Sequence, residues 1–445
     1  MWKIAKSLDP TRLIEDMSVV AWDHLQTYGH GDTDINSWHF YTADYEFARE
    51  HIANVVKETY AGSSYNYVPG YQQGSQPLIN SEYGGVGAMD GDIDVSWSFK
   101  FLTNELRRHG PPSAYIYTEL HDVEWERNGF LNYDRTPKEF GYNPTLVNRG
   151  DVLPMDAPPV GRHAAGSEIS IDVYSSHFSR QKRGPMTLHW RLSGIDSIGW
   201  VEDELLTDSS PIAFTPHQVE LARTITLKLP ERTMACTLWV AAQTDCGVVV
   251  ARNFVQFHDV GNTADREQLG EKFIVRLAPE SWSECEWTDG HSTREEASRD
   301  GLCFGRGRGW FEWVIPTDNL PEKPTRVTVL CEASARRETQ AQTDAFARSS
   351  SFQLQLNDVV IHRATLPNHP FDARGALSYL RGGKGAYGYL MHATVEGELL
   401  DRVSHEKGSW RLRCAVPENA DNAGGLTIYA GDCGRFPVPP TLIIQ

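Results

Sequence analysis

The spacing of apolar residues changes once along this chain of 445 residues, and that change limits the folds that it can adopt. Up to about residue 145, stretches with helical spacing alternate with short strand-like stretches. Strands that alternate with helices favour βα units and a parallel sheet. Beyond this point the helical spacing disappears. Short alternating runs separated by turn residues follow, and these are typical of antiparallel sandwiches.

The first part is expected to contain four strands that pair in parallel in sequence order. We expect these strands near residues 13–16, 38–41, 77–82 and 114–120, and helices at 1–8, 44–60 and 95–109. A proline-rich segment at 151–159 is typical of a linker. Two all-β blocks follow it, and a polar stretch at 259–271 separates them. At roughly 150 residues per domain, the length agrees with about three domains.

Charge and composition exclude several classes of protein. Aspartate and glutamate outnumber lysine and arginine by 59 to 42, which gives a formal charge of −17 that repels phosphate backbones and anionic lipid. No run approaches the ~20 apolar residues that cross a bilayer. The seven cysteines form no C-x-x-C pair, which disfavours a zinc site or a disulfide framework. We therefore expect no nucleic-acid partner, no membrane partner, no metal and no cofactor.

Glu82 is the first candidate for chemistry. It stands at the end of an expected parallel strand and is followed closely by Gly84 and Gly85, which let a ligand approach the backbone. The carboxyl ends of parallel strands form the catalytic rim of an α/β barrel. Taken alone, an acid that caps the next helix explains the position equally well.

Two further stretches end neighbouring strands. His39 and Tyr41 share one face of their strand because side chains alternate, although such a pair more often serves packing. The segment 117–129 concentrates four acids at the end of the next strand, and a solvated acidic loop is the simpler explanation for it. The combination of the three stretches is more informative than any one of them.

Together these residues resemble glycoside hydrolase family 2, the group of β-galactosidases, β-glucuronidases and β-mannosidases. The resemblance rests on Asp-Pro-Thr-Arg at 9–12, on Asp34 with His39 and Tyr41, on Ser-Glu-Tyr-Gly-Gly at 81–85, and on residues 118–135. It covers about 135 residues in the family's order and spacing. Residues 166–257 also resemble the immunoglobulin-like domain that follows the barrel in many members, and the last block resembles a galactose-binding-type jelly roll.

The resemblance implies a multidomain fold in three parts. Residues 1–145 would be the C-terminal half of a (β/α)8 TIM barrel, with strands five to eight. Residues 146–262 would be an immunoglobulin-like β-sandwich. Residues 263–445 would be a galactose-binding-like jelly roll that can bind carbohydrate.

The resemblance also implies a retaining β-glycosidase that acts on an oligosaccharide or glycoside. Glu82 would be the nucleophile and Tyr41 would hydrogen-bond its carboxylate, while His39, Asp34 and Glu119 would contact the substrate. A retaining site needs two carboxyl groups ~5–5.5 Å apart, of which one attacks and one shuttles the proton. A hydroxyl donor beside the nucleophile favours its charged form.

The chain departs from the family pattern at the second carboxyl group. The family's general acid/base is a glutamate in an Asn-Glu pair that precedes the region matched here, and the Asn104–Glu105 pair is expected within a helix instead. We therefore expect a fragment or split subunit whose acid/base half is supplied by a complementary chain. The alternative is a non-catalytic carbohydrate-binding or vestigial protein, for which Trp282, Trp287 and Trp410 are candidate sugar-stacking surfaces or, more simply, core residues.

Overall fold

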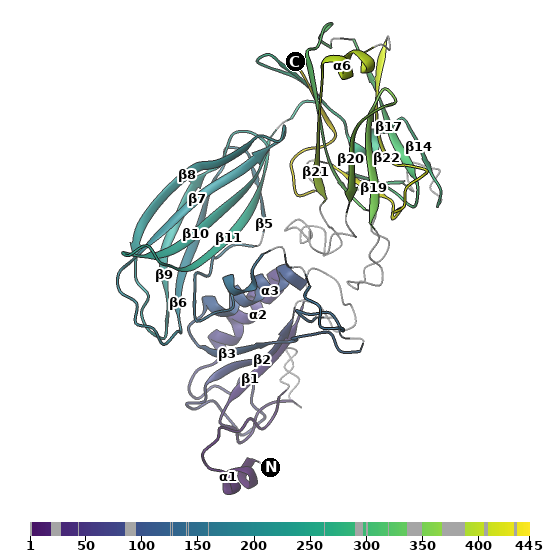
Figure 1. The fold of residues 1–445 in the computed structure, drawn as a ribbon. Coiled ribbons are helices and arrows are strands. Elements are labelled where there is room, and N and C mark those ends of the chain that lie inside the picture. Colours follow the sequence, from purple (N-terminus) through teal and green to yellow (C-terminus); the bar gives the residue numbers. More distant parts are fainter. Residues whose placement is uncertain are drawn as a thin grey trace.

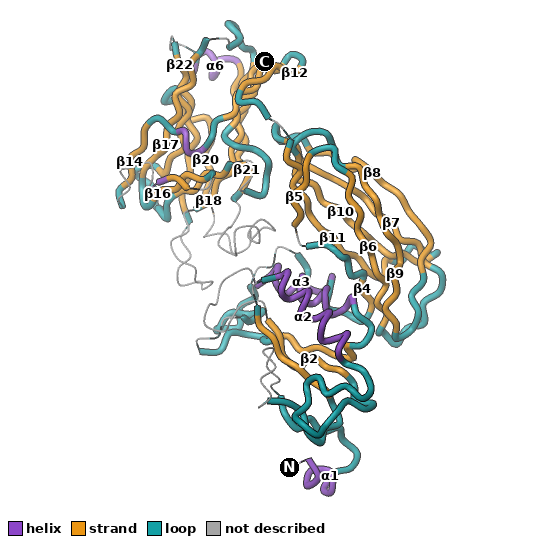
Figure 2. Tube along the Cα trace, turned by 180° about the vertical axis from the view of Figure 1, so that it is seen from behind, coloured by secondary structure: helices purple, strands orange, loops and turns teal. Residues whose placement is uncertain are grey.

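The computed structural model shows three bodies that follow one another along the chain (Figure 1). An α/β body comes first, a β-sandwich second and a larger β body third, and the same arrangement is seen from behind in Figure 2. No helix in the described part of the chain is both long and apolar enough to cross a membrane. The structure describes residues 2–18, 28–42, 44–84, 95–124, 126, 128–138, 140, 142–158, 160–261, 263–289, 297–299, 301–318, 320–335, 349–366, 388–404, 408–430 and 434–445.

The α/β body is built on a parallel sheet with the order β1-β2-β3, as the alternation of strands and helices predicts. Its helices α2 and α3 pack on one face, where the large side chains of all three strands gather. The elements are α1 (Trp2–Leu8), β1 (Asn36–Tyr41), α2 (Tyr45–Glu58), β2 (Leu78–Gly84), α3 (Val95–Arg108) and β3 (Pro112–Tyr117).

The strand expected at 13–16 is absent, and that expectation was wrong. The segment does lie beside the residues that lead into β1, because the amide of Asp34, two residues before that strand, donates to the carbonyl of Ile14 at 2.9 Å. Side chains make further contacts: the Asp34 carboxylate accepts from the amide of Ile14, and Ser37 of β1 donates to Glu15. A strand requires a repeating ladder of backbone hydrogen bonds, which this segment does not make.

Helix α3 joins the α/β body to the sandwich. Asn104 exchanges two hydrogen bonds with the backbone of Met155, of 2.9 and 2.8 Å. The Arg107 guanidinium donates to the carbonyl oxygens of Arg149 and Gly150 at 2.5 and 3.0 Å. Nearly every residue of α3 is buried, because the sheet covers one side of the helix and the sandwich covers another.

The second body is a β-sandwich, as expected from its alternating runs. One sheet has the order β5-β11-β10-β7-β8 and the other β4-β6-β9. All pairs are antiparallel except β5 with β11. The strands are β4 (Asp151–Val152), β5 (Val160–Ala164), β6 (Glu168–His177), β7 (Met186–Asp196), β8 (Val201–Ile212), β9 (Gln218–Lys228), β10 (Met234–Thr244) and β11 (Val249–Val260).

The proline-rich segment at 151–159 is not a free linker, which corrects the expectation from sequence. Its first two residues form β4, where Asp151 and Val152 pair with β6. Leu153 and Met155 are completely buried in the sandwich core. The apolar residues between the prolines therefore outweigh the tendency of proline to mark a loop.

The third body also has two packed sheets. Among its described strands, one sheet has the order β12-β13-β24-β18-β23-β16-β15, and β21 joins it by pairing with β18. The second sheet has the order β14-β17-β22-β19-β20. The polar stretch expected at 259–271 is partly strand, because it contains the end of β11 and all of β12. The strands are β12 (Arg266–Leu269), β13 (Lys272–Arg276), β14 (Glu284–Trp287), β15 (Ser298–Arg299), β16 (Leu302–Gly305), β17 (Gly309–Pro316), β18 (Arg326–Ser334), β19 (Ser350–Leu356), β20 (Val359–Leu366), β21 (Tyr389–Glu396), β22 (Ser409–Val416), β23 (Leu426–Tyr429) and β24 (Thr441–Ile444), with a short helix α6 (Gly397–Val403).

The core of this body accounts for three of its tryptophans. Trp282, Trp287 and Trp410 are each less than 9% exposed and lie in one apolar cluster between the sheets. The simpler of the two expectations for them, core packing, is therefore correct.

Candidate active site

Strands β1 and β2 bring three of the candidate residues together. His39 lies directly opposite Glu82 in the parallel register, and Tyr41 lies opposite Gly84. The alternating residues Trp38 and Phe40 point the other way and are 1% exposed in the core beneath the helices. The period of two along a strand therefore leaves His39 and Tyr41 on the face of the sheet away from the helices.

Tyr41 holds the carboxylate of Glu82. Its hydroxyl donates a hydrogen bond to Oε1 of Glu82. Burial, reinforced by this hydrogen bond, raises the pKa of Tyr41 well above its ordinary value, while a hydrogen bond with the Thr118 side chain acts in the opposite direction. The phenol therefore remains a protonated donor throughout the neutral range.

Gly84 makes room for this arrangement. A Cβ atom built on Gly84 would lie 3.1 Å from two ring carbons of Tyr41. Such a contact is tighter than normal packing, so a larger residue at this position would force the ring of Tyr41 to shift. This gives one of the two glycines after Glu82 a steric role; Gly85 lies outside the described residues.

His39 lies beside the second oxygen of Glu82. Its Nδ1 is 3.7 Å from Oε2, which is too long for a hydrogen bond but close enough for electrostatic interaction. Burial lowers the pKa of His39 below its ordinary value, although the carboxylates of Glu82 and Glu15 act in the opposite direction. A largely neutral imidazole can exchange hydrogen bonds with a sugar hydroxyl as either donor or acceptor.

Glu119 follows β3 and faces other acids. Burial first, and then the carboxylates of Glu126 and Asp122, raise the pKa of Glu119. Its Oε1 atom is buried without a hydrogen-bond partner among the described residues. Asp122 itself is paired with Lys138 at 2.7 Å, and both side chains are almost fully buried.

The structure does not bring Asp34 to this group. Asp34 precedes β1, whereas His39 and Tyr41 lie towards the other end of the same strand. Its carboxylate binds the Lys6 ammonium at 2.8 Å, and this contact is the main cause of its lowered pKa. Asp34 thus ties α1 to the start of β1.

Glu15 is a neighbour of the site that the sequence argument did not single out. It accepts a hydrogen bond from Ser37, two residues before His39 on the same face, and it interacts electrostatically with His39. The signal was present in the sequence, because Glu15 falls in the segment expected to run next to β1.

The assembled group has one carboxylate held by a phenol, one partly buried imidazole and further acids nearby. Such a set can provide a nucleophile and donors to hydroxyl groups. The described residues contain no cluster of three or more histidine, cysteine, aspartate or glutamate side chains that could hold a metal ion.

Comparisons with known proteins give no match to a family model and none to a curated sequence. Among solved structures, the chain is similar over 96% of its length to β-glucuronidase 2 of Bacteroides uniformis, with 14% identity, a TM-score of 0.26 and 49% of that chain covered. The chain is also similar over 96% of its length to β-glucuronidase of Parabacteroides merdae, with 10% identity, a TM-score of 0.30 and 45% of that chain covered. The chain thus spans about half the length of these proteins.

A second kind of solved structure is similar to part of the chain. A CBM36 carbohydrate-binding module, solved with calcium and xylotriose, matches 39% of this chain and 98% of its own, with 7% identity and a TM-score of 0.18. Solved structures similar to this chain therefore include β-glucuronidases and a carbohydrate-binding module, at low identity and low TM-scores.

Proposed function

We propose that residues 1–145 carry the nucleophile half of a retaining β-glycosidase, with Glu82 as the glycosyl nucleophile. The observation that supports this most is the hydrogen bond from Tyr41 to Glu82, at the ends of two adjacent parallel strands and beside His39. In the reaction, a Glu82 oxygen would bond to the anomeric carbon while the bond to the leaving oxygen breaks. The leaving oxygen would take a proton from a second carboxyl group, and water would later release the sugar.

The second carboxyl group is proposed to come from a complementary chain. Strand β3 pairs only with β2 among the described strands, so its outer edge is free of a neighbouring strand. Ile116 on β3 is 58% exposed, on the face opposite to Tyr115 and Tyr117, which pack towards the helices. An open sheet edge with an apolar side chain on its inner face supports a partner that would extend the sheet.

The role of Glu82 as nucleophile can be tested without a general acid. A 2-deoxy-2-fluoro-β-glycosyl fluoride has a leaving group that needs no proton, and its ring fluorine slows release of the trapped sugar. We expect the glucuronic acid, galactose or mannose form to add one glycosyl group to the chain, and peptide mass spectrometry should locate it on Glu82. Glu82→Gln should remove the adduct, because an amide cannot form the glycosyl ester.

A matched control is Glu50→Gln, which changes an exposed acid on α2 and should label normally. Failure of all three reagents to label Glu82, or labelling that persists in Glu82→Gln, would overturn the proposal.

The second candidate function is carbohydrate binding without turnover. The three tryptophans of the third body do not support it, because they are core residues. A different surface, on the sandwich, does carry features of a sugar-binding site.

A further inference from the structure

The outer face of the five-stranded sheet of the sandwich contains a hollow of about 600 Å³. Its floor is the small residue Ala241 on β10, and Trp239 stands two residues away on the same face. Ala241 lies opposite His189 of β7 and Arg252 of β11. Neighbouring side chains on one face of a sheet lie within about 5.5 Å at Cβ, so these larger residues surround the alanine.

Trp239 is held in place on one side and open on the other. Its ring lies 4.8 Å from that of Phe254, its neighbour on β11, and Phe254 in turn packs against Trp97 of α3. The Trp239 side chain is nevertheless 38% exposed. A flat ring that is fixed before a ligand arrives loses little conformational freedom on binding.

The charged groups around this ring have few partners. The side chains of Arg191, the β7 neighbour of Trp239, and of Arg252 make no ion pair or hydrogen bond among the described residues, and the same holds for the side chain of His189. Two acids, Glu204 and Asp208, also line the hollow, and Asp208 accepts from the amide of Ser209 at 2.7 Å. Guanidinium groups can donate two parallel hydrogen bonds to adjacent oxygen atoms of one ligand.

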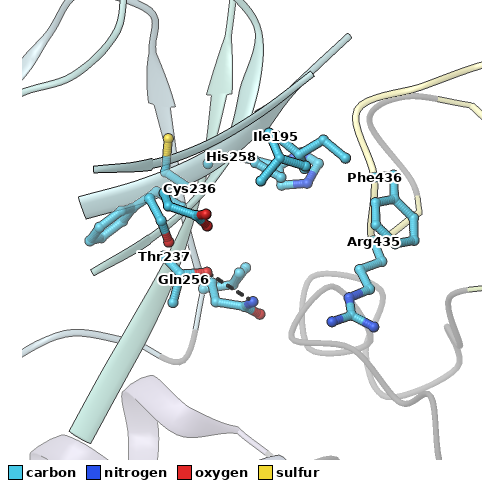
Figure 3. Close-up of a pocket in the computed structure, with 14 residues that line it drawn as sticks. Ile195, Cys236, Thr237, Gln256, His258, Arg435 and Phe436 are labelled. Carbon is cyan, nitrogen blue, oxygen red and sulfur yellow. Dashed lines mark hydrogen bonds between the residues drawn. The ribbon is translucent and has the colours of Figure 1, made fainter. Parts of the chain in front are cut away.

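A second hollow, of about 220 Å³, lies further along the same face (Figure 3). Thr237 lines it and receives a hydrogen bond of 3.4 Å from Gln256, while Arg435 and Phe436 of the third body lie across from them. At 3.3–3.4 Å per residue, Thr237 and Ala241 are separated by about 13 Å along β10, with Trp239 between them. The two hollows therefore flank one tryptophan on one strand.

The loop that closes the second hollow is firmly anchored. The buried carboxylate of Glu332 accepts hydrogen bonds of 2.9 Å from the amides of both Arg435 and Phe436, and one of 2.8 Å from that of Gly388. The backbone of Arg435 is thus held in place within the third body.

We propose that this surface binds an oligosaccharide that runs along β10, with one sugar ring stacked on Trp239 and its neighbours in the two hollows. Sugar rings present an apolar face for an aromatic ring and hydroxyl groups all round their edge, which matches one tryptophan ringed by arginine, histidine, threonine and glutamine. A protein partner is less suited, because two acids, Glu204 and Asp208, line the larger hollow and acidic residues are depleted at the centres of protein interfaces. This site is separate from Glu82 and does not depend on the glycosidase proposal.

The test uses the full chain and three soluble hexasaccharides: cellohexaose, xylohexaose and hexagalacturonic acid. We expect at least one to change the tryptophan fluorescence and to give a calorimetric binding isotherm. Trp239→Ala should weaken that binding by at least about tenfold, as loss of an aromatic stacking partner does, and Trp239→Phe should retain part of it. Glu50→Gln, at an exposed acid on α2 that lines neither hollow, should bind normally. The readout is oligosaccharide binding and not labelling of Glu82, so failure here is distinct from failure of the nucleophile.

The matched control is Trp200→Ala, which removes another exposed tryptophan of the sandwich that lies in the turn before β8 and lines neither hollow. Absence of binding by all three probes at millimolar concentration would overturn the proposal, as would binding that survives Trp239→Ala. Self-association of the chain that Trp239→Ala abolishes would identify the surface as a protein interface instead.

Discussion

The ammonium group of Lys100 on α3 donates a hydrogen bond of 2.6 Å to the carbonyl oxygen of Phe254 on β11. The ammonium group also lies over the ring of Phe254, 4.7 Å from its centroid. Lys100 has no carboxylate partner among the described residues, and burial lowers its pKa to about 7. An amine without a carboxylate partner is thus buried where the α/β body meets the sandwich, and it is charged only below about pH 7.

Stability should depend on pH through Lys100. Between pH about 7 and the ordinary lysine pKa, the unfolded chain binds a proton at this site and the folded chain does not, so stability rises with pH. The slope is at most about 1.4 kcal/mol per pH unit, and it vanishes below the folded-state pKa because both states are then protonated. Lys100→Met should remove this slope in urea unfolding, while Lys57→Met, at an exposed site on α2, should leave it unchanged. Equal slopes in all three proteins would contradict the assignment.

Tyr41→Phe should slow the labelling of Glu82 by a fluoroglycosyl fluoride by about 10–1000-fold, as removal of one donor does in preorganised sites. The ring is retained, so the change tests the hydroxyl alone. Reaction rates followed by intact-protein mass would measure it. A rate equal to that of the unaltered chain would show that the hydrogen bond to Glu82 does not assist the attack.

Asn104→Ala should destabilise the contact between the α/β body and the sandwich by about 2–4 kcal/mol, because the backbone amide and carbonyl of Met155 lose their buried partner. Thermal or urea unfolding would measure the change. Asn54→Ala, which removes a surface hydrogen bond to Tyr65, should stay within about 0.5 kcal/mol. A similar small effect at Asn104 would mean that water replaces the side chain.

Limited proteolysis should cut between the two β bodies, near residues 261–265, because β11 ends at Val260 and β12 begins at Arg266. We predict resistant fragments on both sides, of which one contains the domain at about 146–262 and the other corresponds to the domain at about 263–445. Preferential cutting inside β6 to β11 would argue against two independently folded domains.

Hydrogen exchange should distinguish the α/β sheet from the sandwich. We expect faster exchange in β3, which has one open edge, than in β10, which is paired on both sides. Protection of β3 that matches β10 in the isolated chain would contradict the proposal that a partner is needed at that edge.

Much of this fold was predictable from local pattern. The alternation of strands and helices gives the parallel order of β1, β2 and β3, and the period of two along β1 puts His39 and Tyr41 on one face. Both results depend only on local geometry, which the sequence encodes directly.

The expectations that failed concern contacts between distant parts of the chain. The segment at 13–16 replaces a backbone ladder by side-chain contacts through Asp34 and Ser37, and no local pattern distinguishes the two. The arrangement around Trp239 was missed for the same reason, because the residues that surround it come from three strands and one helix. Asp34 was expected at the site only because of its spacing from His39 and Tyr41 in the sequence. That spacing does not show that Asp34 precedes β1, whereas His39 and Tyr41 lie towards the other end of the strand.

The burial of Leu153 and Met155 has a consequence for how this chain can be divided. The sandwich takes part of its core from the stretch that enters it, and that stretch is tied to Asn104 of the preceding helix. A recombinant sandwich that begins after this stretch would contain an unfilled space in its core, and an α/β body that ends before it would expose the face of α3. The stretch at the boundary therefore belongs to both bodies, and neither body can be separated there as a self-contained module.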